Sequence, residues 1–202
     1  HRAALVATNA RRLGARVPVI VADACRPPLR PGSFDRVLLD AVVGLIREAR
    51  RRTGKAIYLL AANRTAALAL RAAHAWQGAG ADAAGLGGLL LLHPRLYVQT
   101  PQGGEDGEYL PIVGRSRVPR YIFLPAQSSG RWHLQKLLDA FERAGSPAFA
   151  QMLPGVSDGF ATRPDARPEE LETTRKLPSM LVSALRALAA FGRAPPNVGA
   201  PA

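Results

Sequence analysis

The sequence is poor in cysteine and lysine and has no long apolar run, and each shortage excludes a class of protein. A single cysteine, Cys25, among 202 residues cannot form an intrachain disulfide or a metal site held by several thiolates. No apolar run reaches the roughly 18 residues that a membrane-spanning helix needs. One cysteine fits the bacterial cytoplasm and periplasm equally. We therefore expect a soluble protein in either compartment, without a membrane span or a metal ion.

The positive charge comes almost entirely from arginine. The 27 basic residues exceed the 15 acidic ones and give a net charge of +12, but the only lysines are Lys55, Lys136 and Lys176. Such a basic protein, rich in arginine, alanine, glycine and proline, is typical of a GC-rich bacterial genome. The one dense basic run, residues 47–52, lies at the end of a predicted helix, where the helix dipole favours cations. The charge therefore permits nucleic-acid binding but does not favour it.

Apolar strands alternate with helical segments along most of the chain. Continuous apolar runs predict strands buried on both faces, and apolar residues at helical spacing predict helices. The predicted strands are residues 17–22, 56–61, 86–92, 120–124 and 148–153, and the predicted helices are residues 2–13, 33–52, 64–76, 132–143 and 178–191. This alternation predicts an α/β fold, an open, mainly parallel sheet with helices on both faces. We expect a single domain over residues 1–191 and a flexible Pro/Gly tail over residues 192–202.

In an open parallel sheet, ligands bind at the carboxyl ends of the strands. The segments that follow the predicted strands supply the candidates for a binding crevice: Asn63, Gln127, Ser128, Trp132 and Asp158. Trp132 also starts a predicted helix, so that it either lines the crevice or packs into the core. The acidic residues of the segment 105–108 do not have the spacing of a calcium loop, and we interpret them as a solvated turn.

Residues 57–73, IYLLAANRTAALALRAA, combine a strand, a sharp turn and an alanine-rich helix. This is the setting of the nucleophile elbow, in which a G-x-S-x-G turn lifts a serine above the sheet. The stretch resembles the α/β-hydrolase superfamily, with residues 61–65 at the elbow. The downstream order of HPRLY, PAQSSGRW and LPGVSDGF after three strands is similar to that family. Residues 89–163 look more narrowly like hydrolase-like proteins associated with bacterial redoxin modules, and the whole resemblance covers about residues 40–190.

The sequence departs from this family at each catalytic position. Alanine and threonine stand at the elbow glycines, and Asn63 replaces the serine, although an amide is no nucleophile. The loop in which the family carries its acid contains Gln127 and two serines, and Asp158 lies where the family carries its histidine. We therefore predict a catalytically degenerate protein without a cofactor, serving as a binding or structural subunit beside other protein subunits. An active hydrolase with relocated residues, such as a base at His133, remains an alternative.

The resemblance also implies strands before residue 1. In this superfamily, the strand before the first helix lies centrally and carries the oxyanion-hole loop, whereas the present sequence begins at that helix and without methionine. We therefore expect the chain to be part of a longer polypeptide.

Residues 9–41, NARRLGARVPVIVADACRPPLRPGSFDRVLLDA, resemble a different family. They look like the middle of class I S-adenosylmethionine-dependent methyltransferases, particularly rRNA cytosine methyltransferases. The resemblance places Asp23 beside the adenine of the cofactor, while Val42 and Val43 stand where a Pro-Cys nucleophile pair would follow. A methyltransferase-like enzyme that uses S-adenosylmethionine and acts on RNA is therefore the alternative function.

Overall fold

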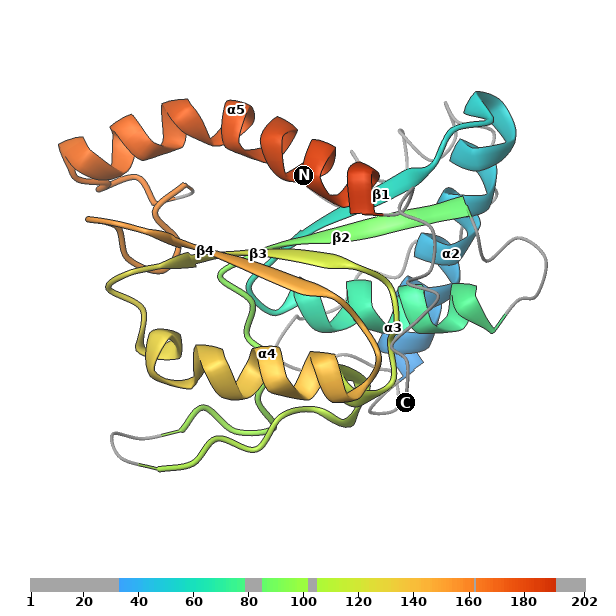
Figure 1. Ribbon diagram of the computed structural model, residues 1–202, viewed down its shortest axis with the longest axis horizontal. Helices are drawn as coiled ribbons and strands as arrows, with labels where there is room; N and C mark the ends of the chain where they lie inside the picture. Colours follow the sequence, from blue (N-terminus) through green and yellow to red (C-terminus); the bar gives the residue numbers. More distant parts are fainter. Residues whose placement is uncertain (1–32, 79–84, 102–104, 162, 192–202) are drawn as a thin grey trace, which may run out of the picture. The chain divides into compact units, whose positions relative to one another are not determined.

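The computed structural model describes residues 33–78, 85–101, 105–161 and 163–191 (Figure 1). The chain divides into two units, residues 1–36 and residues 37–202, and the account below concerns the second. The elements predicted over residues 2–13 and 17–22, Asp23 and the tail over residues 192–202 lie outside the described residues. The single domain over residues 1–191 and the cofactor role of Asp23 therefore stay predictions.

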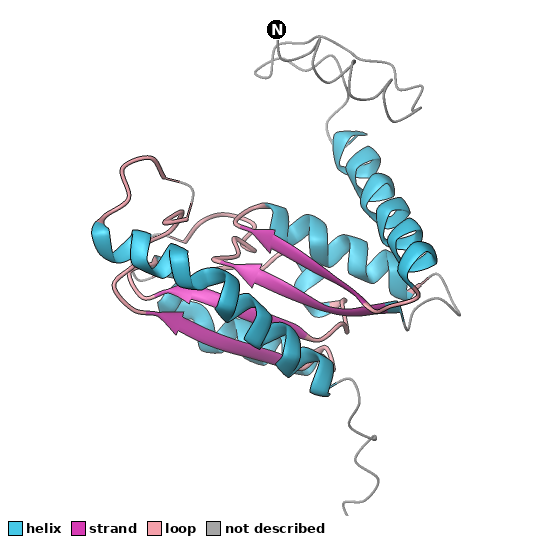
Figure 2. Cartoon of the chain, turned by 90° about the horizontal axis from the view of Figure 1, so that it is seen from above, coloured by secondary structure: helices cyan, strands magenta, loops and turns pink. Residues whose placement is uncertain are grey.

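A four-stranded parallel sheet forms the centre of the second unit. Its strands are β1 (Ile57–Ala62), β2 (Leu86–Leu92), β3 (Arg120–Pro125) and β4 (Ala148–Leu153). They lie in the order β1-β2-β3-β4, and each neighbouring pair is parallel, so that all four arrows point the same way in Figure 2. The predicted α/β class with a parallel sheet is confirmed, and every strand ends at the same edge.

Helices cover both faces of this sheet. α3 (Thr65–Gln77), α4 (Leu134–Arg143) and α5 (Pro168–Phe191) lie against the sheet, and α2 (Ser33–Thr53) contributes Ile46 to one of the apolar clusters. Figure 1 shows α3 and α4 on one face of the sheet and α5 on the other. One apolar cluster lies under α3 and α4, and a second lies under α5. Along β2, Leu89 and Leu91 belong to the cluster of α3, whereas Leu90 and Leu92 belong to the cluster of α5. This burial on both faces explains why β2 is a continuous apolar run.

Two adjacent glycines let β2 pack closely against its neighbours. A Cβ atom on Gly88 would lie 2.9 Å from the Leu188 Cδ1 of α5 and 3.1 Å from the Pro119 carbonyl oxygen. A Cβ atom on Gly87 would lie 2.6 Å from the ring of Tyr58, where the register between β1 and β2 shifts by one residue. A side chain at either position would therefore displace atoms that the fold has already placed.

The last two helices begin elsewhere than predicted. The expected start of the last helix at residue 178 was wrong, because α5 begins at Pro168 and contains Pro178 in its interior. Pro168 followed by Glu169 and Glu170 in the first turn is a recognisable helix start. The helix expected from residue 132 is a 3₁₀ helix, η3 (Ser129–His133), that leads into α4.

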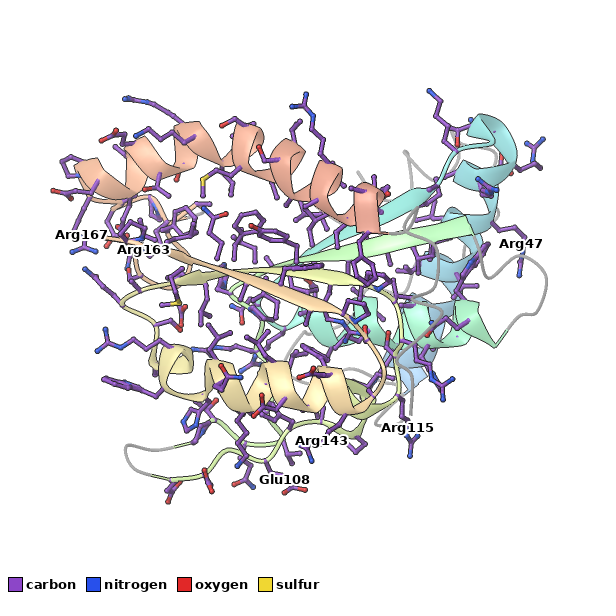
Figure 3. All side chains as sticks on the ribbon, in the orientation of Figure 1. Arg47, Glu108, Arg115, Arg143, Arg163 and Arg167 are labelled. Carbon is purple, nitrogen blue, oxygen red and sulfur yellow. The ribbon has the colours of Figure 1, made fainter. Side chains whose placement is uncertain are left out.

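Arg120 of β3 is buried, and the exposed arginines among the described residues are spread over the surface rather than gathered on one face. In Figure 3, Arg47 lies near one end of the described unit and Arg163 near the other. The dense basic run is in the last turn of α2, as predicted. There Arg51 and Arg52 reach the Glu48 carboxylate at 2.8 and 2.6 Å. These exposed ion pairs are typical of a solvated helix end.

Candidate active site

The carboxyl ends of the four strands are linked to one another by backbone hydrogen bonds. The bonds run from Asn63 N–H to Leu92 (3.0 Å), from His93 N–H to Phe123 (2.8 Å) and from Ala126 N–H to Leu153 (2.8 Å). In each bond, the first residue past one strand donates to a carbonyl at the end of the next strand. The segments after the strands are therefore held side by side along one edge of the sheet.

Asn63 occupies the sharp turn between β1 and α3. Its φ of 52° lies in the left-handed region, which asparagine adopts more readily than most residues. Its carbonyl oxygen accepts from the N–H groups of Arg95 (3.0 Å) and Ala66 (3.3 Å), and its side chain is exposed. The Thr65 hydroxyl closes the turn by donating to the Ala62 carbonyl at 2.6 Å. The predicted elbow is thus present as a strand, a left-handed residue and a helix.

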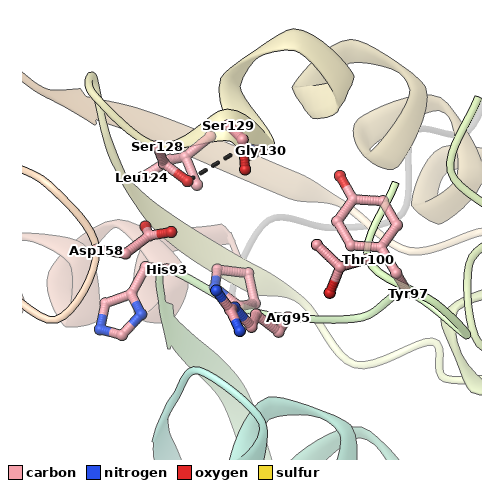
Figure 4. A pocket seen from close by; sticks show the side chains of 10 residues that line it. His93, Arg95, Tyr97, Thr100, Leu124, Ser128, Ser129, Gly130 and Asp158 are labelled. Carbon is pink, nitrogen blue, oxygen red and sulfur yellow. Dashed lines mark hydrogen bonds between the residues drawn. The ribbon is translucent and has the colours of Figure 1, made fainter. Parts of the chain in front are cut away.

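A small pocket of about 30 Å³ lies beside this turn, at the ends of β2, β3 and β4 (Figure 4). Its lining residues are His93, Pro94, Arg95, Tyr97, Thr100, Leu124, Ser128, Ser129, Gly130 and Asp158. Of the five predicted crevice residues, Ser128 and Asp158 line this pocket. Gln127 and Trp132 are close in the sequence to lining residues, and Asn63 accepts a hydrogen bond from the Arg95 N–H, but none of the three lines the pocket.

Trp132 is not a core residue. Its side chain is 74% exposed, and the guanidinium of Arg131 lies 4.2 Å from the centre of its ring. The interpretation that it packs into the core is therefore wrong. Arg131 in turn donates to the Ala126 carbonyl at 2.8 Å, so that this cation–π pair is anchored to the end of β3.

His93 is buried at the end of β2 in an unusual backbone conformation. Its φ is 38° and it is only 7% exposed. Burial lowers the pKa of its imidazole, and nearby Arg95 lowers it further, whereas Asp158 acts in the opposite direction. The ring is therefore neutral at neutral pH. Our sequence reasoning placed His93 at a strand end without selecting it, although it is the first polar residue after a continuous apolar run.

The carboxylate of Asp158 faces the same pocket from the segment after β4. Figure 4 shows it next to the ring of His93. Its Oδ1 atom is buried, and no donor among the described residues lies within hydrogen-bonding distance. The next residue in the pocket wall, Ser128, accepts a hydrogen bond at its Oγ atom from Gly130 N–H at 3.1 Å. The hydroxyl proton of Ser128 is therefore free to donate.

A buried carboxylate on α5 fixes the segment that carries Asp158. Glu170 is fully buried and accepts from the Ser157 hydroxyl (2.7 Å) and from the guanidinium of Arg163 (2.6 Å). It also accepts from Arg167 N–H at 3.0 Å. The hydrogen bond from Ser157 is the main cause that holds its pKa well below the ordinary range, and the Arg167 N–H adds to it. The Arg167 guanidinium also donates to Gln127 at 2.7 Å, which ties the segments after β3 and β4 together.

Aromatic packing fixes the opposite wall of the pocket. The rings of Tyr97 and Tyr109 stack with their centres 4.9 Å apart, and Tyr97 meets His133 edge-on at 5.9 Å. The Tyr109 hydroxyl donates to the His133 carbonyl at 2.8 Å. These contacts hold the segment after His93 against the start of α4. They also place His133 outside the residues that line the pocket.

No group of three or more His, Cys, Asp or Glu side chains within the described part of the chain is arranged to hold a metal ion. In the acidic turn, the Asp106 carboxylate lies 3.2 Å from the Lys136 ammonium in an exposed ion pair. None of the described helices is long and apolar enough to cross a membrane.

A parallel sheet with an elbow at the end of its first described strand and a helix after that elbow is the arrangement expected of the α/β-hydrolase fold. Solved structures agree: esterases from the fungus Rhizomucor miehei align with a TM-score of 0.57 and 16% identity over 82% of this chain and 62% of theirs. A sugar hydrolase from Lactococcus lactis aligns with a TM-score of 0.57 and 16% identity, over 84% of this chain and 75% of its own. The thermophilic carboxylesterase EstE1 from a metagenomic library aligns with a TM-score of 0.52 and 13% identity, over 84% of this chain and 66% of its own.

The chain therefore has the α/β-hydrolase fold, and the predicted resemblance is confirmed at the level of the fold. It spans 62% of the length of the fungal esterase that it matches. No protein-family model matches the sequence, and no curated protein is similar to it in sequence.

Proposed function

We propose that the chain is a catalytically degenerate protein of the α/β-hydrolase fold that serves as a binding or structural subunit of a larger assembly. The observation that carries the proposal is Asn63. It holds the left-handed turn position, with a φ of 52°, at which this fold presents a nucleophile. A carboxamide has no ionisable proton that a neighbouring base could remove to create an attacking anion. The Asn63 side chain thus stands at the position of the nucleophile but cannot act as one.

The other two triad positions support the same conclusion. The segment after β3, where the hydrolase resemblance implies an acid, contains Gln127 and Ser128. The segment after β4, where it implies a histidine, contains Asp158. His93 comes from a different strand end, and no hydrogen bond from any described residue reaches the Oδ1 atom of Asp158. Removing a nucleophile and its base together leaves only the contributions of binding and of the oxyanion hole.

Uncovered edges and apolar side chains support the assembly role. The edge strands β1 and β4 have only one strand neighbour each among the described residues. Large apolar side chains are exposed on these strands: Leu60 (57%), Phe149 (37%) and Met152 (39%). Unprotected edges and exposed apolar groups are typical of surfaces that another chain covers.

Turnover of simple esters tests the catalytic half of the proposal. The chain and its Asn63→Ala variant are incubated with p-nitrophenyl acetate and p-nitrophenyl butyrate, and release of nitrophenolate is measured. We expect both proteins to match the buffer rate. Saturable turnover by the chain that the Asn63→Ala variant loses would overturn this half of the proposal.

Sedimentation velocity tests the subunit half. A subunit isolated from its partners is expected to associate through its uncovered apolar surface and to sediment as species heavier than a monomer. Phe149→Lys on β4 should reduce this association, because a charge on an edge strand opposes pairing. Leu171→Lys, which alters an exposed position on α5, is the matched control. A stable, monodisperse monomer over micromolar concentrations would contradict the subunit role.

A further inference from the structure

We propose that the pocket of His93, Arg95, Ser128 and Asp158 binds a hydroxyl-bearing end of a neutral ligand, such as a polyol or a sugar, with the hydroxyl donating to Asp158. The inference rests on the proposed function, because it assigns a ligand class to a site that binds without reacting. It depends on the donors and acceptors that the chain leaves unused in this pocket.

Asp158 supplies an acceptor that lacks a donor from the described residues. Its Oδ1 atom is buried, yet no hydrogen bond reaches it. Most buried polar atoms in native proteins have a partner, and an unpaired acceptor opposes folding. The fold nevertheless holds this carboxylate in place through the neighbouring bonds of Ser157 to Glu170. A ligand O–H or N–H group would supply the missing donor.

Ser128 supplies the complementary donor. Its Oγ atom already accepts from Gly130 N–H, so the remaining hydrogen-bonding capacity of the hydroxyl includes its proton. A ligand group that uses both the Ser128 proton and the Asp158 acceptor must therefore accept and donate. A hydroxyl does both, whereas an ammonium group only donates and a carboxylate only accepts.

The charges around the pocket favour a neutral ligand. Arg95 contributes one positive charge and Asp158 one negative charge, and both act on the intervening His93. The imidazole itself is neutral at neutral pH. An anionic ligand would be repelled by the carboxylate, and a cationic ligand would be repelled by the guanidinium. Neither therefore gains electrostatic binding energy over a neutral ligand.

The size of the pocket sets how much of a ligand enters it. A volume of about 30 Å³ holds a hydroxyl group with its carbon, but not a sugar ring. Only the end of the ligand is therefore expected inside, between Asp158 and Ser128, and the remainder lies toward solvent.

Titration by ¹H–¹⁵N NMR tests this assignment with three probes of similar size: glycerol, sodium acetate and ethylammonium chloride, at constant ionic strength. We expect saturable shifts of the Ser128, Gly130 and Asp158 amides with glycerol alone. Asp158→Ala and Ser128→Ala should each weaken glycerol binding by about tenfold or more, since each loses a hydrogen bond in a closed site. Asp139→Asn, a change at an exposed position of α4, is the control that leaves binding unchanged.

Each remaining outcome decides against the assignment. Equal shifts with all three probes, or glycerol shifts that survive both pocket variants, would overturn it and leave only an ordered water in the pocket. The ester assay separates the two proposals. Absent glycerol binding with absent ester turnover removes the ligand class alone, whereas ester turnover that depends on Asn63 removes the proposed function.

Discussion

Replacing Asp158 by asparagine is expected to stabilise the chain, because the carboxylate is held where one of its oxygen atoms has no hydrogen-bond donor from the described residues. Its buried Oδ1 atom has no donor from the described residues, and such a group destabilises a fold by about 1–3 kcal/mol. Asparagine has the same shape and is less unfavourable to bury without a partner. Arg95 lines the same pocket but is exposed and forms no ion pair with Asp158 among the described residues, so that losing the negative charge offsets at most about 1 kcal/mol. The net expectation for Asp158→Asn is a gain of about 1–2 kcal/mol.

Urea unfolding followed by circular dichroism at pH 7.5 measures this gain. For a chain of this size, each kcal/mol corresponds to a rise in melting temperature of about 2–4 °C, so that thermal unfolding gives an independent value. Asp139→Asn on α4 repeats the chemical change at an exposed site and is expected to stay within about 0.5 kcal/mol of the wild type. If Asp158→Asn instead loses more than about 1 kcal/mol, the carboxylate has a structural partner and the reasoning is refuted.

Three further changes test the packing and the buried ionisable groups. Gly88→Ala places a methyl group against Leu188 and a backbone carbonyl, and urea unfolding should show a loss of about 1–3 kcal/mol; an unchanged midpoint would show that α5 can move away without loss. Glu170→Gln removes a carboxylate whose pKa lies below its ordinary 4.5, so its contribution to stability is present above pH 4.5 and is lost as the pH falls. The variant should be less stable at pH 7 and show a flatter decline below pH 4.5 than the wild type. His93→Gln removes an imidazole whose pKa lies below 6.5; the unfolded chain takes up that proton first, so the wild type should lose stability as the pH falls below 6.5. Unfolding at pH 7.5, 6.0 and 5.0 should show a smaller decline for His93→Gln, and equal slopes would contradict the buried, neutral histidine.

The two central strands, β2 and β3, could be predicted from the sequence because they are buried on both faces. The predicted run at residues 86–92 coincides with β2 for this reason, and the run at residues 148–153 coincides with β4, although that strand lies at the edge of the sheet and is largely exposed. The beginning of α5 could not be found from the rule that proline starts helices, because two prolines compete. Pro168, with acidic residues after it, is the true start, and the helix continues past Pro178.

The candidate site was only partly predictable, for a physical reason. Ser128 and Asp158 follow strands, and the rule for open parallel sheets selects them without further knowledge. His93 and Arg95 also follow a strand, but which residues after β2 face Ser128 and Asp158 depends on long-range contacts, such as the bonds from His93 N–H to Phe123 and from Arg95 N–H to Asn63. Such contacts leave no local pattern in the sequence. The turn at Asn63, in contrast, can be predicted from the strand and the helix on either side of it.

The central claim is that a hydrolase fold is present here without a nucleophile at its elbow. Incubation of the folded chain with an excess of an alkyl fluorophosphonate, followed by intact-mass measurement and peptide mapping, tests that claim most directly, because this reagent forms a covalent adduct with activated serines. The account predicts an unmodified mass for the wild type, even after prolonged incubation. A stoichiometric adduct on Ser128, Ser129 or any other residue at the carboxyl ends of the strands would contradict it.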